Sequence, residues 1–210
     1  MLSSCLAHRR ETWHAVGVTA TRRLGATDSK TRALLLDGAE RLLLRDGYAA
    51  VTSRRVAAEA GVKPQLVHYY FRTMDDLFLE VYRRRAEQGI ERFAAAMEVD
   101  RSLRTVWRFG TDARSAAFNI EFVAVAKHRD AVRDEVARYA RRYREMQLDA
   151  IAGILTDHGV PADACPPIVV LLAITGVSQV MALETSLGVT AGHGAMMDFV
   201  DRWIATTEGR

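Results

Sequence analysis

The sequence predicts an all-α protein. Apolar residues recur at helical spacing in successive segments from about residue 29 to residue 206, and Gly, Pro and good N-capping residues stand between these segments. From about residue 74 the segments become long, so a small helical unit precedes a larger one. A chain of 210 residues can form one domain or two small ones and can bury a sizeable core.

The first helix is expected from about Ser29 to Asp46. Asp28 or Ser29 can cap its N-terminus, because their side-chain oxygens accept hydrogen bonds from the free amides of a first helical turn. Gly38 lies in mid-helix, where glycine costs about 1 kcal/mol relative to Ala. We therefore expect another helix to pack closely at Gly38, and we expect Gly47 to end the first helix.

Two short helices joined by a tight turn are predicted over residues 52–71. Thr52 is a suitable N-cap, Gly61 can end the first of them in a left-handed conformation, and Pro64 suits the first turn of the second. The residues that face the partner helix at helical spacing are Val56, Ala57 and Ala60. Their small size allows the close crossing that a helix-turn-helix requires.

The second short helix carries side chains suited to DNA. Val67 and Phe71 can point inward, which leaves Lys63, Gln65, His68, Tyr69 and Tyr70 on other faces. Gln can pair bidentately with an adenine edge, and Tyr hydroxyls and His ring N–H groups can contact phosphate oxygens. On spacing alone, a surface helix hairpin with aromatic core residues remains an alternative.

This segment resembles the DNA-binding domain of the TetR/AcrR family of transcriptional repressors. The resemblance covers about fifty residues; its matching residues are Gly47, Tyr48, Thr52, Val56, Ala57, Ala60, Gly61, Val62, His68, Tyr69, Tyr70, Phe71, Asp75, Asp76, Leu77 and Phe78. Two positions depart from the family: Met74 stands where a phosphate-contacting Lys is common, and His68 stands where Tyr is common. Together with residue chemistry, the resemblance implies base contacts from Lys63, Gln65 and Tyr69, phosphate contacts from Thr52, Arg54, His68 and Tyr70, and an apolar contact from Pro64 to a thymine methyl.

Further helices are expected at about 74–97, 100–107, 113–127, 130–156, 168–187 and 195–206. Residues 168–187 are apolar nearly all round, so this helix should be buried. It is interrupted by Ser178, Gln179, Glu184 and Thr185, and we therefore expect no membrane span. The family resemblance implies that the helices at 168–187 and 195–206 pair with a second copy as a four-helix bundle, which makes a homodimer.

A small-molecule effector site in the C-terminal helical domain is implied by the same resemblance. The aromatic and methionine side chains on the helices that would line it are Trp107, Phe118, Phe122, Tyr139, Tyr143 and Met146. Such a lining would suit an apolar or aromatic effector. Each of these residues taken singly can also be plain core.

The charge distribution supports DNA binding, and the residue types present argue against a disulfide-rich, metal-binding or catalytic protein. Residues 1–74 carry a net charge of +6 and the remainder a net of −3, which fits a DNA-facing N-terminal end. Residues 1–28 are expected to be a flexible basic arm or a disordered leader. Two cysteines far apart in sequence and six histidines without metal-binding spacing predict no disulfide scaffold, metal site or cofactor. We find no catalytic motif, and a reducing cytoplasm is the simplest location.

The sequence therefore predicts three parts: an arm at 1–28, a helix-turn-helix DNA-binding domain at 29–73 and a helical effector-binding and dimerisation domain at 74–210. The family resemblance implies sequence-specific transcriptional regulation, with repression that is relieved when a small apolar or aromatic effector releases the protein from a pseudo-palindromic double-stranded operator. A dimeric helical interaction protein, or a small-molecule-binding protein without specific DNA binding, is the alternative. A helical enzyme would need a catalytic constellation that we do not find.

Overall fold

The computed structural model describes residues 30–209 and is all helical over that range. Its elements are α1 (Lys30–Asp46), the 3₁₀ turn η1 (Tyr48–Ala50), α2 (Ser53–Glu59), α3 (Gln65–Tyr70), α4 (Met74–Val99), α5 (Leu103–Gly110), α6 (Ala113–Ala126), α7 (Asp130–Asp157), α8 (Pro167–Ser186) and α9 (His193–Glu208). The predicted fold class is confirmed. The expectation for residues 1–28 lies outside the described residues.

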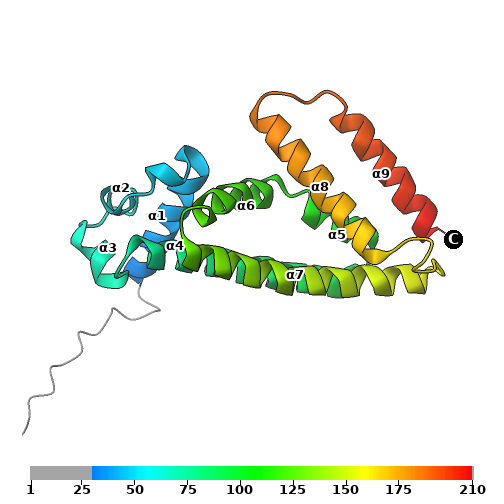
Figure 1. The fold of residues 1–210 in the computed structure, drawn as a ribbon, viewed down its shortest axis with the longest axis horizontal. Helices are drawn as coiled ribbons and strands as arrows, with labels where there is room; N and C mark the ends of the chain where they lie inside the picture. Colours follow the sequence, from blue (N-terminus) through cyan, green and yellow to red (C-terminus); the bar gives the residue numbers. More distant parts are fainter. Residues whose placement is uncertain (1–29, 210) are drawn as a thin grey trace, which may run out of the picture.

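The helices form a small head at one end and an open hairpin at the other (Figure 1). Helices α1–α3 make the head, and α4 leaves it to run along α7, with which it packs closely. Helix α6 packs on α7 and reaches back to α1 and η1. Helix α8 packs on α7 and α6 and projects from them with α9 as a hairpin, and α5 contacts both α8 and α9.

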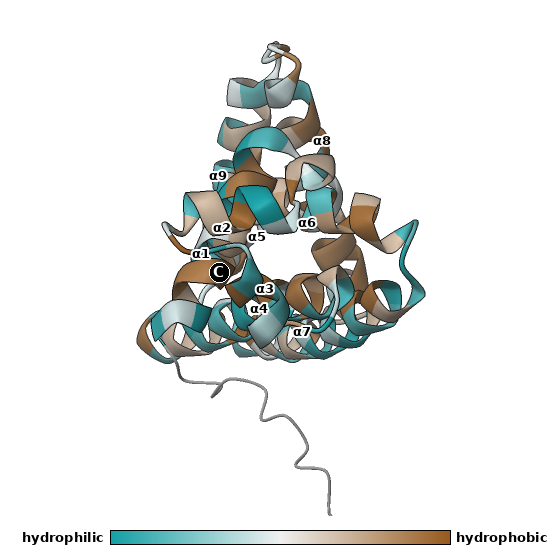
Figure 2. Ribbon diagram, turned by 90° about the vertical axis from the view of Figure 1, so that its left-hand side faces the viewer, coloured by the Kyte–Doolittle hydropathy of each residue, from teal (hydrophilic) through white to brown (hydrophobic). Residues whose placement is uncertain are grey.

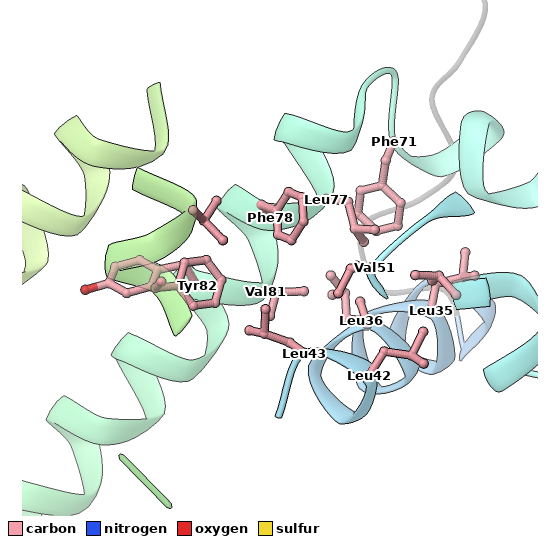
Figure 3. Close-up of a cluster of buried hydrophobic side chains, with 14 of the residues drawn as sticks. Leu35, Leu36, Leu42, Leu43, Val51, Phe71, Leu77, Phe78, Val81 and Tyr82 are labelled. Atoms are coloured by element: carbon pink, nitrogen blue, oxygen red, sulfur yellow. The ribbon is translucent and has the colours of Figure 1, made fainter. Parts of the chain in front are cut away.

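The hydrophobic core of the head does not end at α3 but continues into α4. Leu77, Phe78 and Val81 from α4 lie against Leu36 and Val51 in one buried cluster (Figure 3). The same cluster continues into α6 and α7 through Phe118, Phe122 and Tyr139. A second cluster joins α4, α5, α7, α8 and α9, with Phe93, Trp107, Ile151, Leu171 and Ile204 among its buried members. Head and helical domain are therefore connected by continuous packing.

Helix ends are capped where the sequence provides suitable side chains. The Thr73 hydroxyl accepts from the Asp76 amide and the Asp76 carboxylate accepts from the Thr73 amide, a complete capping box at the start of α4. The short helix expected at 100–107 begins later, at Leu103, because Ser102 caps it by accepting from the Thr105 amide.

Three successive arginines of α4, Arg83 to Arg85, pair with acidic side chains of neighbouring helices, although the Arg83 side chain stays 44% exposed. Arg83 pairs with Glu135 of α7, Arg84 with Asp37 and Glu40 of α1, and Arg85 with Glu40. These long side chains reach acidic partners on two neighbouring helices, so they tie α4 to its surroundings.

Helix α8 is not buried all round in the single chain. One face is buried, through Val170, Leu171, Ile174 and Ser178. The large apolar side chains that remain exposed on it are Ile168, Val169, Leu172, Val180 and Leu183. Figure 2 shows hydrophobic colour on α8 where it stands away from the layer of α4 and α7. The expectation of complete burial is therefore wrong for one copy of the chain.

By length and composition α8 also meets the criterion for a membrane-crossing helix, with a mean hydropathy of 1.8 over 18 residues. Its polar residues thus do not shorten the apolar run as much as we expected from the sequence. The core helix of a soluble protein meets the same criterion, so this single helix is weak evidence for a membrane span.

Candidate nucleic-acid interface and helical core

The helix-turn-helix is built from local signals that the sequence carries. The Thr52 hydroxyl caps α2 by accepting from the Arg55 amide, and Gly61 ends that helix with φ +67°. A Cβ on Gly38 would lie 3.3 Å from the Val56 carbonyl oxygen, so α1 and α2 cross closely there, as predicted. Val67 and Phe71 are buried and anchor α3 from within.

The opposite side of α3 is open to solvent. Tyr69 is 46% exposed, and its ring packs edge-on to Tyr70 at a centroid distance of 5.0 Å. The predicted DNA-contacting residues that the structure leaves exposed are Thr52, Arg54, Lys63, Pro64, Gln65, His68 and Tyr69, whereas Tyr70 is half-buried. A rigid short helix with polar and aromatic side chains outward is what major-groove reading needs.

Some basic side chains of the head form ion pairs with acidic residues, whereas others form none within the described residues. Arg41 and Arg45 both bond to Glu59, and Arg55 pairs with Asp46. The hydrogen bond from Arg41 holds the pKa of Glu59 below its usual value, and the hydrogen bond from Arg45 does the same for the pKa of Asp46. Within residues 30–209, Arg54 and Lys63 have no ion pair, so their charge is available to phosphates.

The predicted effector-pocket residues divide between two buried clusters of the helical domain. Phe118 and Phe122 lie 4.6 Å apart between ring centroids, and Tyr82 stands 4.9 Å from Phe122 and 5.8 Å from Tyr139. Burial raises the pKa of the Tyr82 hydroxyl to about 12. Tyr82 is central to this cluster and was missed, although its helical spacing from Phe78 in α4 could have indicated it.

The other predicted residues lie beside the second cluster. Trp107 is buried in α5, and its indole N–H has no hydrogen-bond partner among the described residues. Tyr143 packs edge-on to Phe93 at 5.4 Å, and burial raises the pKa of its hydroxyl to about 12. Tyr143 and Met146 pack against both clusters, so they connect the two halves of the predicted lining.

Two open grooves lie outside these two buried clusters. One of about 470 Å³ is lined by Val123, Ala126, Lys127, Arg133, Val136 and Ala137, between α6 and α7. Another of about 380 Å³ lies between α8 and α9, where His193 bonds to Glu184 at 2.8 Å. In the part of the chain that is described, no group of His, Cys, Asp or Glu side chains could hold a metal ion.

This chain is similar in sequence to known bacterial transcriptional regulators. Residues 35–81 match the family described as bacterial regulatory proteins, tetR family. The HTH-type transcriptional regulator BetI of Rhizobium meliloti (strain 1021) is 30% identical over 126 residues, which cover 56% of this chain and 62% of that protein. The match thus spans less than two thirds of the length of this curated relative.

Solved structures share the fold at low identity. A putative transcriptional regulator from Saccharomonospora viridis in complex with choline superposes with a TM-score of 0.66 at 19% identity, over 81% of this chain and 95% of that one. A TetR transcription regulator from Haloarcula marismortui gives 0.66 at 20%, over 84% and 97% of the two chains. FadR from Bacillus subtilis in complex with stearoyl-CoA gives 0.59 at 14%, over 74% and 87%. The head therefore matches the tetR family of bacterial regulatory proteins over residues 35–81, and the described helices share the fold of these solved regulators.

Proposed function

We propose that this protein is a sequence-specific DNA-binding transcriptional regulator, and that it represses until a small apolar or aromatic effector releases it from a pseudo-palindromic operator. The observation that carries the proposal is the exposed polar and aromatic face of α3, next to Arg54 and Lys63, whose charges are not neutralised within the described residues. Positive charge supplies affinity for phosphates, while side chains on the base edges supply specificity.

In this proposal the head divides its contacts by chemistry. Lys63, Gln65 and Tyr69 read base edges, and Pro64 touches a thymine methyl. The residues that hold phosphates are Thr52, Arg54, His68 and Tyr70. Phosphate contacts set register without sequence information, so the reading of the operator depends chiefly on Gln65 and its neighbours.

Replacing Gln65 by Ala tests that reading. We expect a loss of about 1–3 kcal/mol on the operator, together with relaxed preference at one base position. The measurement is equilibrium binding to the operator and to duplexes with each base substituted in turn. Gln88→Ala, which removes an exposed amide from α4, is the matched control. An equal loss on every duplex would show that Gln65 does not read a base.

The exposed apolar surface of α8 and α9 suits a second copy of the chain. Leu172 and Leu183 on α8 are each at least half exposed, and Phe199 on α9 is 59% exposed. Contiguous apolar surface of this kind marks an interaction site. A two-fold dimer through α8 and α9 would present two heads to successive major grooves, which explains a pseudo-palindromic operator. This use of α8 also accounts for its hydropathy without a membrane, and it is compatible with a cytoplasmic protein.

The effector would act through the packed aromatic layer between α4, α6 and α7. An effector opposes DNA binding only to the extent that it binds the DNA-incompetent arrangement more tightly. Aromatic faces accept apolar ligands and also quaternary ammonium groups. Choline, bound by the Saccharomonospora viridis protein, and indole, a neutral aromatic, are therefore two informative probes. Release of operator DNA by indole alone would support the apolar or aromatic class, and release by choline alone would favour a cationic effector.

A dimeric interaction protein without specific DNA binding is the second candidate, favoured by the extent of exposed apolar surface on α8. Selective binding to operator DNA excludes it. We propose no enzymatic activity.

A further inference from the structure

The first turn after α1 is held by a residue from the helical domain. The backbone amide of Tyr48 donates to Glu121 Oε2 of α6 over 3.0 Å, across 73 positions of sequence. Gly47, the residue before η1, provides no side-chain cap. The first N–H of such a turn needs an acceptor, and a carboxylate gives a charge-assisted hydrogen bond that is short and directional. Glu121 therefore caps a turn of the head from outside the head.

The backbone at this point is adapted to the contact. Gly47 has φ +78° and ψ 169°, a conformation that is essentially restricted to glycine. This conformation turns the chain sharply after α1, and the Tyr48 amide then meets Glu121 Oε2. The geometry of the turn is thus linked to the position of one carboxylate on α6.

Two residues of the turn between α6 and α7, His128 and Arg129, make further contacts at the same junction. The His128 ring, in the turn between α6 and α7, stacks on Tyr48 with centroids 6.2 Å apart and an angle of 22° between the rings. Arg129 pairs with Asp75 at the start of α4, and its guanidinium lies 5.1 Å from the centroid of Phe78. The α6–α7 turn therefore touches the head after α1 and again at the start of α4.

We propose that Glu121 is a positioning residue, which sets the orientation of the head relative to the helical domain and so the separation of the two heads in a dimer. This inference rests on the proposed function. Apolar packing between α1, α4 and α6 is non-directional and tolerates small rotations, whereas a single carboxylate bonded to a backbone amide defines one angle. The hydrogen bond of Glu121 goes to the backbone of η1 and not to a side chain of α3, so its effect on DNA binding acts through the orientation of the head.

The test compares operator spacing preferences. The variants are Glu121→Ala, which removes the acceptor, and Glu121→Gln, which keeps a carbonyl acceptor. Asp134→Ala on α7 removes one exposed negative charge without contact to the head and serves as the control for net charge. The operator is first located by footprinting with the unaltered protein. Each protein is then titrated with duplexes in which the two half-sites of that operator are moved apart or together by one and two base pairs.

We expect the unaltered protein and Asp134→Ala to prefer one spacing. Glu121→Ala should reduce that discrimination by about 5-fold or more, the lower part of the usual range for coupled sites. Glu121→Gln should stay within about 2-fold of the unaltered protein, because the amide oxygen can still accept. Circular dichroism confirms that each variant is folded.

Two outcomes would overturn the inference, and they are distinguishable. If Glu121→Ala loses affinity equally at all spacings, Glu121 is structural and does not position the head. If the unaltered protein shows no selective binding on any spacing, the proposed function fails, and this inference fails with it.

Discussion

Glu135 offers the most quantitative test of how the helical domain is held together. This carboxylate on α7 is 9% exposed, and it accepts hydrogen bonds from Arg83 of α4 and from Arg138 one turn along its own helix. Hydrogen bonds first from Arg138 and then from Arg83 lower its pKa from 4.5 to about 2. We expect Glu135→Gln to destabilise the protein at pH 7, because Arg138 loses its anionic partner and Arg83 keeps only Glu80.

The magnitude follows from the pKa. A shift from 4.5 to about 2 would correspond to about 3 kcal/mol if the whole shift stabilised the folded state. Arg83 and Arg138 have side chains 44% and 51% exposed, so solvent screens their charges and we expect about 1–2 kcal/mol instead. The pKa is lowered on folding, so this stabilisation is complete above pH 4.5 and is lost as the pH falls toward 2.

The assay is urea unfolding of both proteins at one fixed concentration, since dimer stability depends on concentration. The difference in unfolding free energy between the two should be about 1–2 kcal/mol at pH 7 and should shrink steadily below about pH 4.5. Glu145→Gln, which removes an exposed charge from the same helix, is the control and should change little. A difference that stays constant from pH 7 to pH 3.5 would refute the assignment of the stabilisation to the ionised carboxylate.

Three further substitutions probe other parts of the structure. Phe122→Ala, at a fully buried position, should cost about 3–5 kcal/mol in urea unfolding, and a cost below 1 kcal/mol would mean that the aromatic layer is loosely packed. Gly47→Ala should cost about 1–2 kcal/mol because φ is +78°, measured against Gly89→Ala in α4, where a Cβ meets no atom within 4 Å. Leu183→Arg on α8 should convert a dimer to a monomer in sedimentation velocity without loss of helix signal, and an unchanged dimer would place the interface elsewhere.

Much of the fold follows from local sequence signals. Helix ends such as Thr52, Gly61 and the Thr73 capping box depend on residues within one turn of each other, so the sequence alone indicates them. The burial of Val67 and Phe71 follows in the same way from helical spacing. Gln65 and Tyr69 lie on the face of α3 opposite these buried residues and are exposed. The candidate DNA-facing side could therefore be predicted from the same spacing.

Contacts between distant segments could not be predicted from local sequence. The bond from Tyr48 to Glu121 and the pairing of Arg83 to Glu135 join residues 73 and 52 positions apart, and no spacing rule relates them. The exposed face of α8 could not be predicted either. An apolar sequence predicts that a helix is buried, but it does not show whether the same chain or a second copy buries it.

Binding of the purified protein to the DNA upstream of its own gene, followed by fluorescence anisotropy across a salt series, tests the central claim most directly. A scrambled duplex of the same length and composition is the control. We predict selective binding at two protomers per site, with selectivity that persists as salt weakens the phosphate contacts. Equal binding to both duplexes that disappears with added salt would reflect phosphate attraction alone and would contradict specific regulation at this site.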